Sequence, residues 1–144
     1  MKFQFRLEKM LHFTHMRESM KKAEIAHLQN DLVILSDRKK KLIDDARNLL
    51  DKQYQNLENG LQNLHYSSQK VLLNIKESER LDGMIINTQE KLDFRVNELH
   101  TLMQKRKGLE KLREKKLAEF TLAKNRKEQH ALDELFVLSK GRQS

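Results

Sequence analysis

Hydrophobic residues in the first half of the chain recur at alternating steps of four and three positions. Between residues 28 and 49 only Lys39 interrupts this spacing. Two apolar positions per seven residues make a narrow stripe that stays on one side of a supercoiled helix, whereas a helix of a globular core shows a broader face. The spacing therefore predicts a coiled-coil seam made by Leu28, Leu32, Leu35, Lys39, Leu42, Ala46 and Leu49.

A second run of the same spacing follows a slip of one residue at positions 49–50. Such a slip changes the winding of a supercoil locally. Polar residues interrupt this run around Ser78 and Asp82, and it recovers at Ile85. We expect the shifted seam to comprise Leu50, Tyr54, Leu57, Leu61, Leu64, Ser68, Val71, Ile75, Ser78, Asp82, Ile85, Leu92, Val96, Leu99 and Met103.

A hairpin of two such helices requires a turn, and the sequence offers two places for it. The first is Asn59-Gly60, residues that tolerate left-handed dihedrals, followed by Ser67 and Ser68 as possible N-caps. The second is Asp82-Gly83, where the seam is most polar. The pattern alone does not choose between them. Without a turn, a single helix would span about 216 Å and would have to dimerise.

The last third of the chain carries a seam of mixed character. Apolar residues persist at Leu109, Leu117, Phe120 and Ala123, but cations occupy seam positions or positions beside them, and an unpaired cation is costly to bury. We therefore expect the seam to open and part of the last helix to stay exposed. The cations are Arg106, Arg113, Lys116 and Lys124.

The composition agrees with long helices and a soluble protein. Of the 144 residues 35% are charged, none is Pro, Trp or Cys, and four are Gly. A sheet protein needs more turn residues, and the lack of Cys rules out disulfides and thiolate metal sites. The start of the chain has no apolar run typical of a secretory signal, and no segment has the roughly 18 apolar residues of a membrane span. We expect one domain over residues 1–144 in the cytoplasm.

The net charge of +8 is unevenly distributed along the chain. Residues 1–22 carry six Lys or Arg against two acids, and residues 104–130 carry ten against four, whereas residues 44–98 carry seven against ten. In a hairpin both basic segments fall at the same end. That end favours an acidic partner, with nucleic acid as a second possibility.

Three kinds of chemistry find little support in the sequence. Glu8, His12 and His15 lie within two helical turns, but a metal site needs further convergent ligands, so no metal or cofactor is expected. No phosphate-binding glycine loop or catalytic carboxylate pair occurs, so we expect no enzymatic activity and no small-molecule substrate. The basic run Asp37 to Lys41 has no interleaved aromatic residues and is best interpreted as a solvated helix face.

Three segments in order resemble the FliJ family of flagellar export proteins. They are "MKFQFRLEKML" at the start, the coiled-coil body, and "NRKEQHALDEL" at 125–135, where Asn125 to Gln129 precedes a Leu-Asp-Glu element at Leu132 to Glu134. "LIDD" at 42–45 and "NG" at 59–60 also fit. The resemblance covers essentially the whole chain.

The resemblance implies a fold and a role. The fold is an antiparallel two-helix coiled-coil hairpin, similar to the paired terminal helices of the rotary-ATPase γ subunit. The role is that of a stalk in the hexameric export ATPase, which promotes ATPase assembly and activity, links it to the membrane export gate and escorts export chaperones. Such proteins are cytoplasmic and peripherally associated with the inner membrane at the flagellar base.

The resemblance also favours the first turn, which sets the expected boundaries. Helix 1 would then cover about 3–57, the turn 58–68 and helix 2 about 68–138, with a frayed tail at 139–144. Helix 2 would extend beyond helix 1 by about 15 residues, or ~22 Å.

Two sets of residues are candidates for partner contacts. The N-terminal segment and the 125–135 block fall at the same basic end of a hairpin, so we expect the export ATPase to contact Phe3, Phe5, Leu7, Arg126, Lys127, Gln129, Asp133 and Glu134. The alternative role of the three apolar residues is a hydrophobic cap over the hairpin end. At the other end Leu72, Lys76 and Glu79 share an outer face and are candidates for the export gate, with a second copy of the chain as the alternative occupant.

Two other functions fit the same features. A virulence-type secretion system uses an equivalent stalk, although the start "KFQFRLEKML" favours the flagellar branch. A basic coiled-coil scaffold or nucleic-acid-binding protein is the alternative from another class, and its affinity for nucleic acid would fall steeply with salt.

Overall fold

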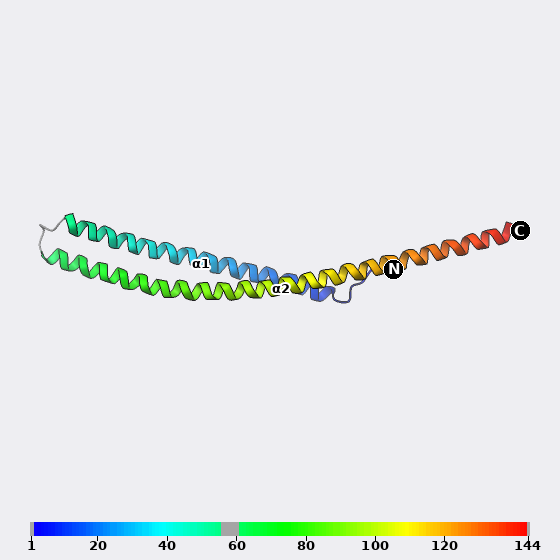
Figure 1. Ribbon diagram of the computed structural model, residues 1–144, viewed down its shortest axis with the longest axis horizontal. Coiled ribbons are helices and arrows are strands. Elements are labelled where there is room, and N and C mark those ends of the chain that lie inside the picture. Colours follow the sequence, from blue (N-terminus) through cyan, green and yellow to red (C-terminus); the bar gives the residue numbers. More distant parts are fainter. Residues whose placement is uncertain (1, 56–60, 144) are drawn as a thin grey trace. The chain divides into compact units, whose positions relative to one another are not determined.

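The computed structural model describes residues 2–55 and 61–143 (Figure 1). It contains two long helices, α1 from Glu8 to Gln55 and α2 from Leu61 to Gln143, and the described residues contain no strand. The helices pack against each other as an antiparallel, all-α hairpin, which confirms the predicted fold class. In the described part of the chain, no helix is long and apolar enough to cross a bilayer.

The internal contacts of the chain fall into two units. Unit 1 comprises residues 1–19 together with 100–144, and unit 2 comprises residues 20–99. Each unit pairs a stretch of α1 with a stretch of α2. We describe each unit by itself.

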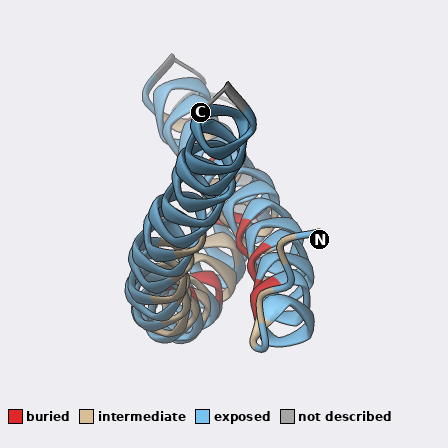
Figure 2. Ribbon diagram, turned by 90° about the vertical axis from the view of Figure 1, so that its right-hand side faces the viewer, coloured by how far each residue is buried: buried red, intermediate tan, exposed pale blue. Residues whose placement is uncertain are grey.

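Unit 2 has a thin core along one line of each helix. Few residues of unit 2 have less than a tenth of their surface exposed. Figure 2 shows the same for the ribbon as a whole, which is mostly exposed and carries only short buried patches in red. A seam of this width is typical of two-stranded coiled coils, because each helix covers only one side of the other. The buried apolar residues are Ile25, Leu35, Ala46, Val71, Leu81 and Leu92.

The seam of α1 confirms the first predicted run. All seven residues predicted between 28 and 49 are buried or half-buried. The polar exception, Lys39, forms an ion pair with Asp82 of α2 at 2.5 Å, so its charge is matched within the seam. A lysine can occupy such a position because its hydrocarbon stem is covered while its ammonium group remains at the edge.

The predicted slip at 49–50 is wrong. The spacing of α1 continues unchanged to Gln53, while Leu50 and Tyr54 are exposed. Gln53 donates hydrogen bonds to the carbonyl oxygen of Leu64 and to Oγ of Ser68, both at 3.2 Å. The seam position is therefore occupied by the polar side chain of Gln53. A search for apolar residues misses this position and selects neighbouring residues instead. The predicted position Leu57 lies outside the described residues.

The predicted seam of α2 is correct at some positions and one residue off at others. Val71, Ile85 and Leu92 are buried or half-buried as expected, whereas Ile75 and Val96 are exposed. Seam positions in a coiled coil are three or four residues apart, so the next position can be either of two neighbours. Where the true seam residue is polar and its neighbour is apolar, the apolar pattern selects the neighbour. Leu64 and Ser68 are also exposed. Ser67, Asn74 and Arg95 occupy the seam in place of Ser68, Ile75 and Val96. Leu81 is buried beside the half-buried Asp82, and Thr88 holds a position that the predicted run skipped.

The helix boundaries differ from the expected ones at three places. The alternative turn at Asp82-Gly83 is wrong, because α2 runs through it without a break. Of the expected turn 58–68, residues 58–60 lie outside the described residues and 61–68 are helical, so Ser67 and Ser68 do not cap a helix. The expected frayed tail is helical as far as Gln143.

In unit 1 the chain starts with an extended segment rather than with a helix. Phe3, Phe5 and Leu7 are half-buried, while the residues between them are exposed. This alternation is the period of an extended chain, and it lets all three apolar side chains face α2. In a helix starting at residue 3, Phe5 would face elsewhere. The backbone N–H of Glu8 donates to the carbonyl oxygen of Phe5 at 3.1 Å, and α1 begins there.

Candidate partner-binding surface

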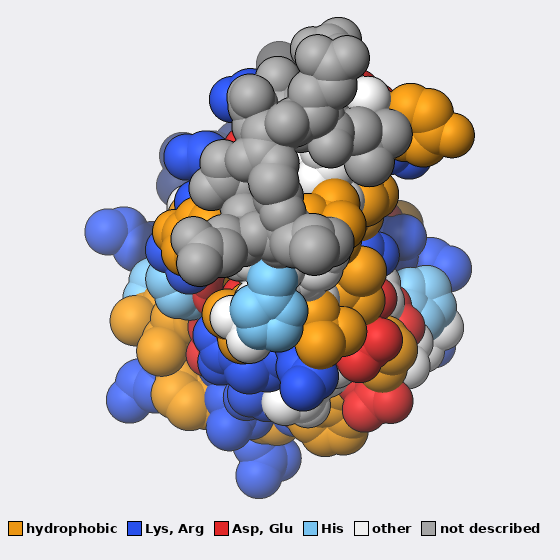
Figure 3. Space-filling view, turned by 90° about the vertical axis from the view of Figure 1, so that its left-hand side faces the viewer, with side chains coloured by type: hydrophobic (Ala, Val, Ile, Leu, Met, Phe, Trp, Pro, Cys, Tyr) orange, Lys and Arg blue, Asp and Glu red, His pale blue; other side chains and the backbone are white. Residues whose placement is uncertain are grey.

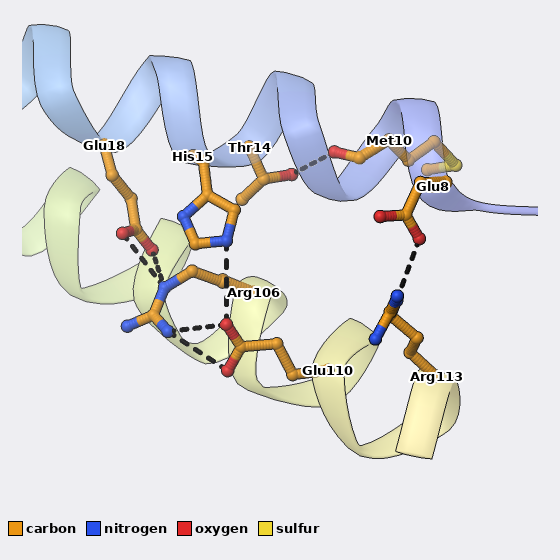
Figure 4. Close-up of polar contacts among 8 residues, drawn as sticks. All are labelled: Glu8, Met10, Thr14, His15, Glu18, Arg106, Glu110 and Arg113. Carbon is orange, nitrogen blue, oxygen red and sulfur yellow. Dashed lines mark hydrogen bonds and ion pairs between the residues drawn. The ribbon is translucent and has the colours of Figure 1, made fainter. Parts of the chain in front are cut away.

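Unit 1 contains a buried charged network in its seam (Figure 4). Glu18 is 4% exposed, and its carboxylate accepts hydrogen bonds from Nε of Arg106 at 2.8 and 3.0 Å. Nη1 of Arg106 donates to Glu110 at 3.0 and 3.1 Å, and Nε2 of His15 lies 3.6 Å from the same carboxylate. The hydrogen bond with Glu18 and then that with Glu110 raise the pKa of Arg106. The cation predicted at this seam position is therefore half-buried and paired with one buried and one half-buried carboxylate.

The N-terminal segment, residues 2–7, packs on α2 next to this network. Phe3 stacks obliquely on Phe120, with ring centroids 5.6 Å apart and planes at 56°. The guanidinium carbon of Arg113 lies 5.7 Å from the Phe3 ring centroid, and its Nε donates to Glu8 at 3.0 Å. An open cavity of about 750 Å³ remains between the segment and α2, lined in part by Phe5, Leu7, Leu112, Lys116 and Phe120.

Beyond Phe120 nothing in the described chain covers α2. Every described side chain from residue 121 to residue 142 is exposed. We call residues 121–143 the C-terminal segment (orange to red in Figure 1). The seam opens, as the cations in this part predict: Leu109 and Phe120 are half-buried, whereas Leu117 and Ala123 are exposed.

One turn near the end of the C-terminal segment, residues 135–138, is apolar around its whole circumference, and the last residues, 139–143, are not apolar. Leu135, Phe136, Val137 and Leu138 follow one another, and each is between 63% and 67% exposed. Four consecutive residues complete a helical turn, so these side chains project in all directions. A helix that is hydrophobic all round is normally buried on all sides. We call Leu132 and 135–138 the apolar tip; Leu132 is 61% exposed.

A band of polar residues precedes and partly overlaps the tip. We call it the polar band; it comprises Arg126, Lys127, Gln129, His130, Asp133 and Glu134. Its residues interact only along the helix: Gln129 donates to Asp133 at 3.4 Å, and His130 lies 3.6 Å from Glu134. Arg126 and Lys127 are exposed and form no ion pair within the described residues. The band therefore presents side chains that are available to a partner.

The structure brings the predicted ATPase-contact residues together only in part. Arg126, Lys127, Gln129, Asp133 and Glu134 lie on the uncovered C-terminal segment. The other three predicted residues pack at the start of that segment, against the part of α2 that ends at Phe120. The apolar tip was not among the predicted contacts, although four consecutive apolar residues in an otherwise charged helix are a visible signal.

The residues predicted to contact the export gate lie in unit 2. Leu72 is 52% exposed, and Lys76 and Glu79 are exposed without ion pairs among the described residues. All three lie on the face of α2 opposite the seam. Figure 3, which faces the left-hand side of Figure 1, shows hydrophobic side chains among basic and acidic ones at that end of the hairpin.

The histidine-rich start of α1 does not assemble a ligand set. Glu8 pairs with Arg113 and His15 approaches Glu110, so two of the three side chains considered for a metal face other partners. Among residues 2–55 and 61–143, no group of three potential ligands comes together.

The two units differ completely in charge. Unit 1 has sixteen Lys or Arg against eight Asp or Glu, whereas unit 2 has thirteen of each. The whole net charge of +8 therefore belongs to unit 1. A partner of unit 1 is accordingly expected to present acidic groups.

Comparison with known protein families, with curated proteins and with solved structures finds no match to this chain.

Proposed function

We propose that this chain is the stalk of a hexameric export ATPase in the flagellar type III export apparatus, and that its C-terminal segment enters the central opening of the ATPase ring. The observation that carries this proposal is the apolar tip on a helix that nothing in the described chain covers. An exposed apolar surface of this kind marks a binding site.

The arrangement of the tip favours a surrounding partner over a flat one. A groove or a second helix covers one side of a helix and leaves the opposite side in water. Leu135 and Val137 project in widely different directions, as do Phe136 and Leu138, because successive residues turn by about 100°. Only a socket or a ring buries all four side chains at once.

The polar band provides contacts that differ from one ATPase subunit to the next, which a uniform apolar contact does not. Six similar subunits around one helix cannot all meet the same side chains. Arg126, Lys127 and Asp133 point charges of both signs outward, so neighbouring subunits meet different charges. A ligand shifts a conformational equilibrium only by binding two states unequally, and charged contacts around the stalk provide that inequality.

The motif resemblance supports the identity of the partner. The same resemblance to the FliJ family suggests that the protein promotes assembly of the ATPase, links it to the export gate and escorts export chaperones. These activities place it in the cytoplasm at the inner membrane of the flagellar base. The positive charge of unit 1 suits insertion into an acidic opening.

The test is ATP hydrolysis by the flagellar export ATPase, titrated with this protein around one copy per hexamer. We expect stimulation that saturates near this ratio. Replacing Leu135, Phe136, Val137 and Leu138 together by Gln should abolish it, because glutamine keeps the helix but removes the apolar surface. The matched control is Val33→Gln with Leu73→Gln, two exposed apolar residues of unit 2.

Two outcomes would count against the proposal. One is stimulation that survives the fourfold glutamine variant, which would exclude the tip as the contact. The other is a helical protein without effect on an ATPase that forms hexamers. If the double substitution Arg126→Ala with Lys127→Ala leaves ATPase binding unchanged, the role assigned to the polar band is wrong even where the tip is needed.

A further inference from the structure

The outer face of α2 in unit 2 carries a symmetric pattern centred on Gly83. Lys76 and Glu90 lie seven residues before and after it, and Leu72 and Phe94 lie eleven residues before and after it. Seven residues make about two helical turns and eleven about three, so all five positions fall on one face. That face points away from α1, since all five residues are exposed.

None of these five residues has a role inside the described chain. Leu72 and Phe94 are 52% and 61% exposed, and the Phe94 ring is approached only by its neighbour Arg95, at 5.8 Å. Lys76 and Glu90 form no ion pair in the described part of the chain. A Cβ added to Gly83 would meet no atom within 4 Å, so packing within the chain does not require a glycine there.

Glycine in the middle of a helix is unfavourable and calls for a reason outside the chain. Glycine weakens helices because its unfolded backbone is the most flexible, and it permits close approach of another backbone. At Gly83 the approach would have to come from a separate molecule, because the face is open.

We propose that a second copy of this chain binds here, antiparallel to the first, with a two-fold axis through Gly83. The axis places each residue opposite the one equally far beyond Gly83. Leu72 then packs against the partner's Phe94, and Lys76 pairs with the partner's Glu90. An interface between identical copies must be complementary to itself, and the order Leu, Lys, Gly, Glu, Phe fulfils this condition in an antiparallel pair.

Charge selects this arrangement over others. A parallel pair in register would place Lys76 on Lys76 and Glu90 on Glu90. Unit 2 carries thirteen positive and thirteen negative side chains, so two copies of it do not repel each other, unlike two copies of unit 1. The contact would also cover Leu72, Lys76 and Glu79, so self-association and binding of an export gate at this face exclude each other.

Gly108 in unit 1 is a built-in control for this reasoning. It too lies within α2, is exposed and has no atom within 4 Å of an added Cβ. The residues at the same offsets are Asn97, Thr101, Lys115 and Glu119, which lack both the apolar pair and the opposite charges. The Gly108 face is therefore not expected to self-associate.

Sedimentation equilibrium of the full chain, from low to high micromolar concentration, tests the proposal. We expect a reversible monomer–dimer equilibrium. Lys76→Glu replaces both ion pairs by Glu–Glu contacts, and Glu90→Lys replaces them by Lys–Lys contacts, so each should weaken the dimer about tenfold. An equimolar mixture of the two variants should form a heterodimer as tight as the original, because both pairs are restored with their signs exchanged.

The control is Lys115→Glu, which changes the net charge as Lys76→Glu does but at the Gly108 face. It should leave the dimer unchanged. Circular dichroism verifies that each variant keeps its helix content. The proposal is overturned if the chain stays monomeric throughout, which would leave this face to a different partner. It is equally overturned if a dimer forms that neither charge reversal weakens, or if mixing the two variants restores nothing.

Discussion

Two stretches of α2 differ in whether their apolar side chains are buried. Between residues 67 and 99 the helix buries Val71, Leu81 and Leu92 against α1 and carries polar side chains on most other positions. In the C-terminal segment nothing is buried, and the apolar side chains of the tip encircle the helix. The first stretch packs against α1, whereas the second has apolar surface that no described residue covers.

Under the proposed function, stability and binding belong to separate parts of one helix. An isolated helix in water gains little from its own hydrogen bonds and depends on packing of an apolar face. The paired stretch has such packing, and the C-terminal segment does not. Substitutions in the paired stretch should therefore change the free energy of unfolding, and substitutions in the C-terminal segment should change binding.

The largest expected effect separates two leucines of α2. Leu81 is 3% exposed, and Leu81→Ala should lower the free energy of unfolding by about 2–3 kcal/mol through lost burial and the cavity left behind. Leu135 is 63% exposed, and Leu135→Ala should change it by less than about 0.5 kcal/mol. Urea unfolding followed by circular dichroism measures both. Equal losses would show that the C-terminal segment is packed in the free protein.

A smaller effect separates two glutamates of unit 1. Glu18 is buried and accepts two hydrogen bonds from Arg106, so Glu18→Ala should cost about 1–2 kcal/mol. Glu128 lies exposed in the C-terminal segment, and Glu128→Ala should be nearly neutral. The same urea experiment applies. If removing Glu18 costs nothing, the buried network does not hold unit 1 together.

The smallest effect concerns acid. A hydrogen bond from Lys21 lowers the pKa of Glu98 below its ordinary value of 4.5, with Arg95 adding to the effect. The ionised carboxylate stabilises unit 2 above pH 4.5, and this contribution is lost as the pH falls through the lowered pKa.

Thermal unfolding between neutral pH and pH 3 measures this loss. The melting temperature should fall in acid, and Glu98→Gln should make the fall less steep. Asp44→Asn is the matched control, because Asp44 is exposed and forms no ion pair in the described part of the chain. An unchanged slope for Glu98→Gln would contradict the assignment.

The hairpin and the seam of α1 could be predicted because apolar residues repeating every 3.5 positions indicate helices that pack as a coiled coil. The seam of α2 could not be predicted fully, because Asn74, Thr88 and Arg95 occupy true seam positions while Ile75 and Val96 attract the pattern to the wrong side. Arg95 is tolerated there because it reaches Glu24 of α1 at 3.4 Å. Such pairings join residues far apart in sequence and leave no local signal.

The candidate site was predictable in kind but not in detail. Cations at seam positions indicated that α2 would become uncovered, and the structure shows where this happens, after Phe120. The pairing of Arg106 with Glu18 was hidden, since 88 residues separate the two. The alternation of Phe3, Phe5 and Leu7 carries the signal for an extended start, which the predicted helix from about residue 3 missed.

Amide hydrogen exchange of this protein, alone and with the export ATPase, tests the central claim most directly. In the free protein, residues 121–143 should exchange quickly, because an uncovered helix opens easily, while residues around Leu81 and Leu92 should be protected. Addition of the ATPase should protect residues 121–143 strongly and change unit 2 little. An ATPase that binds without protecting residues 121–143 would contradict the assignment of the C-terminal segment as the part that enters the ring.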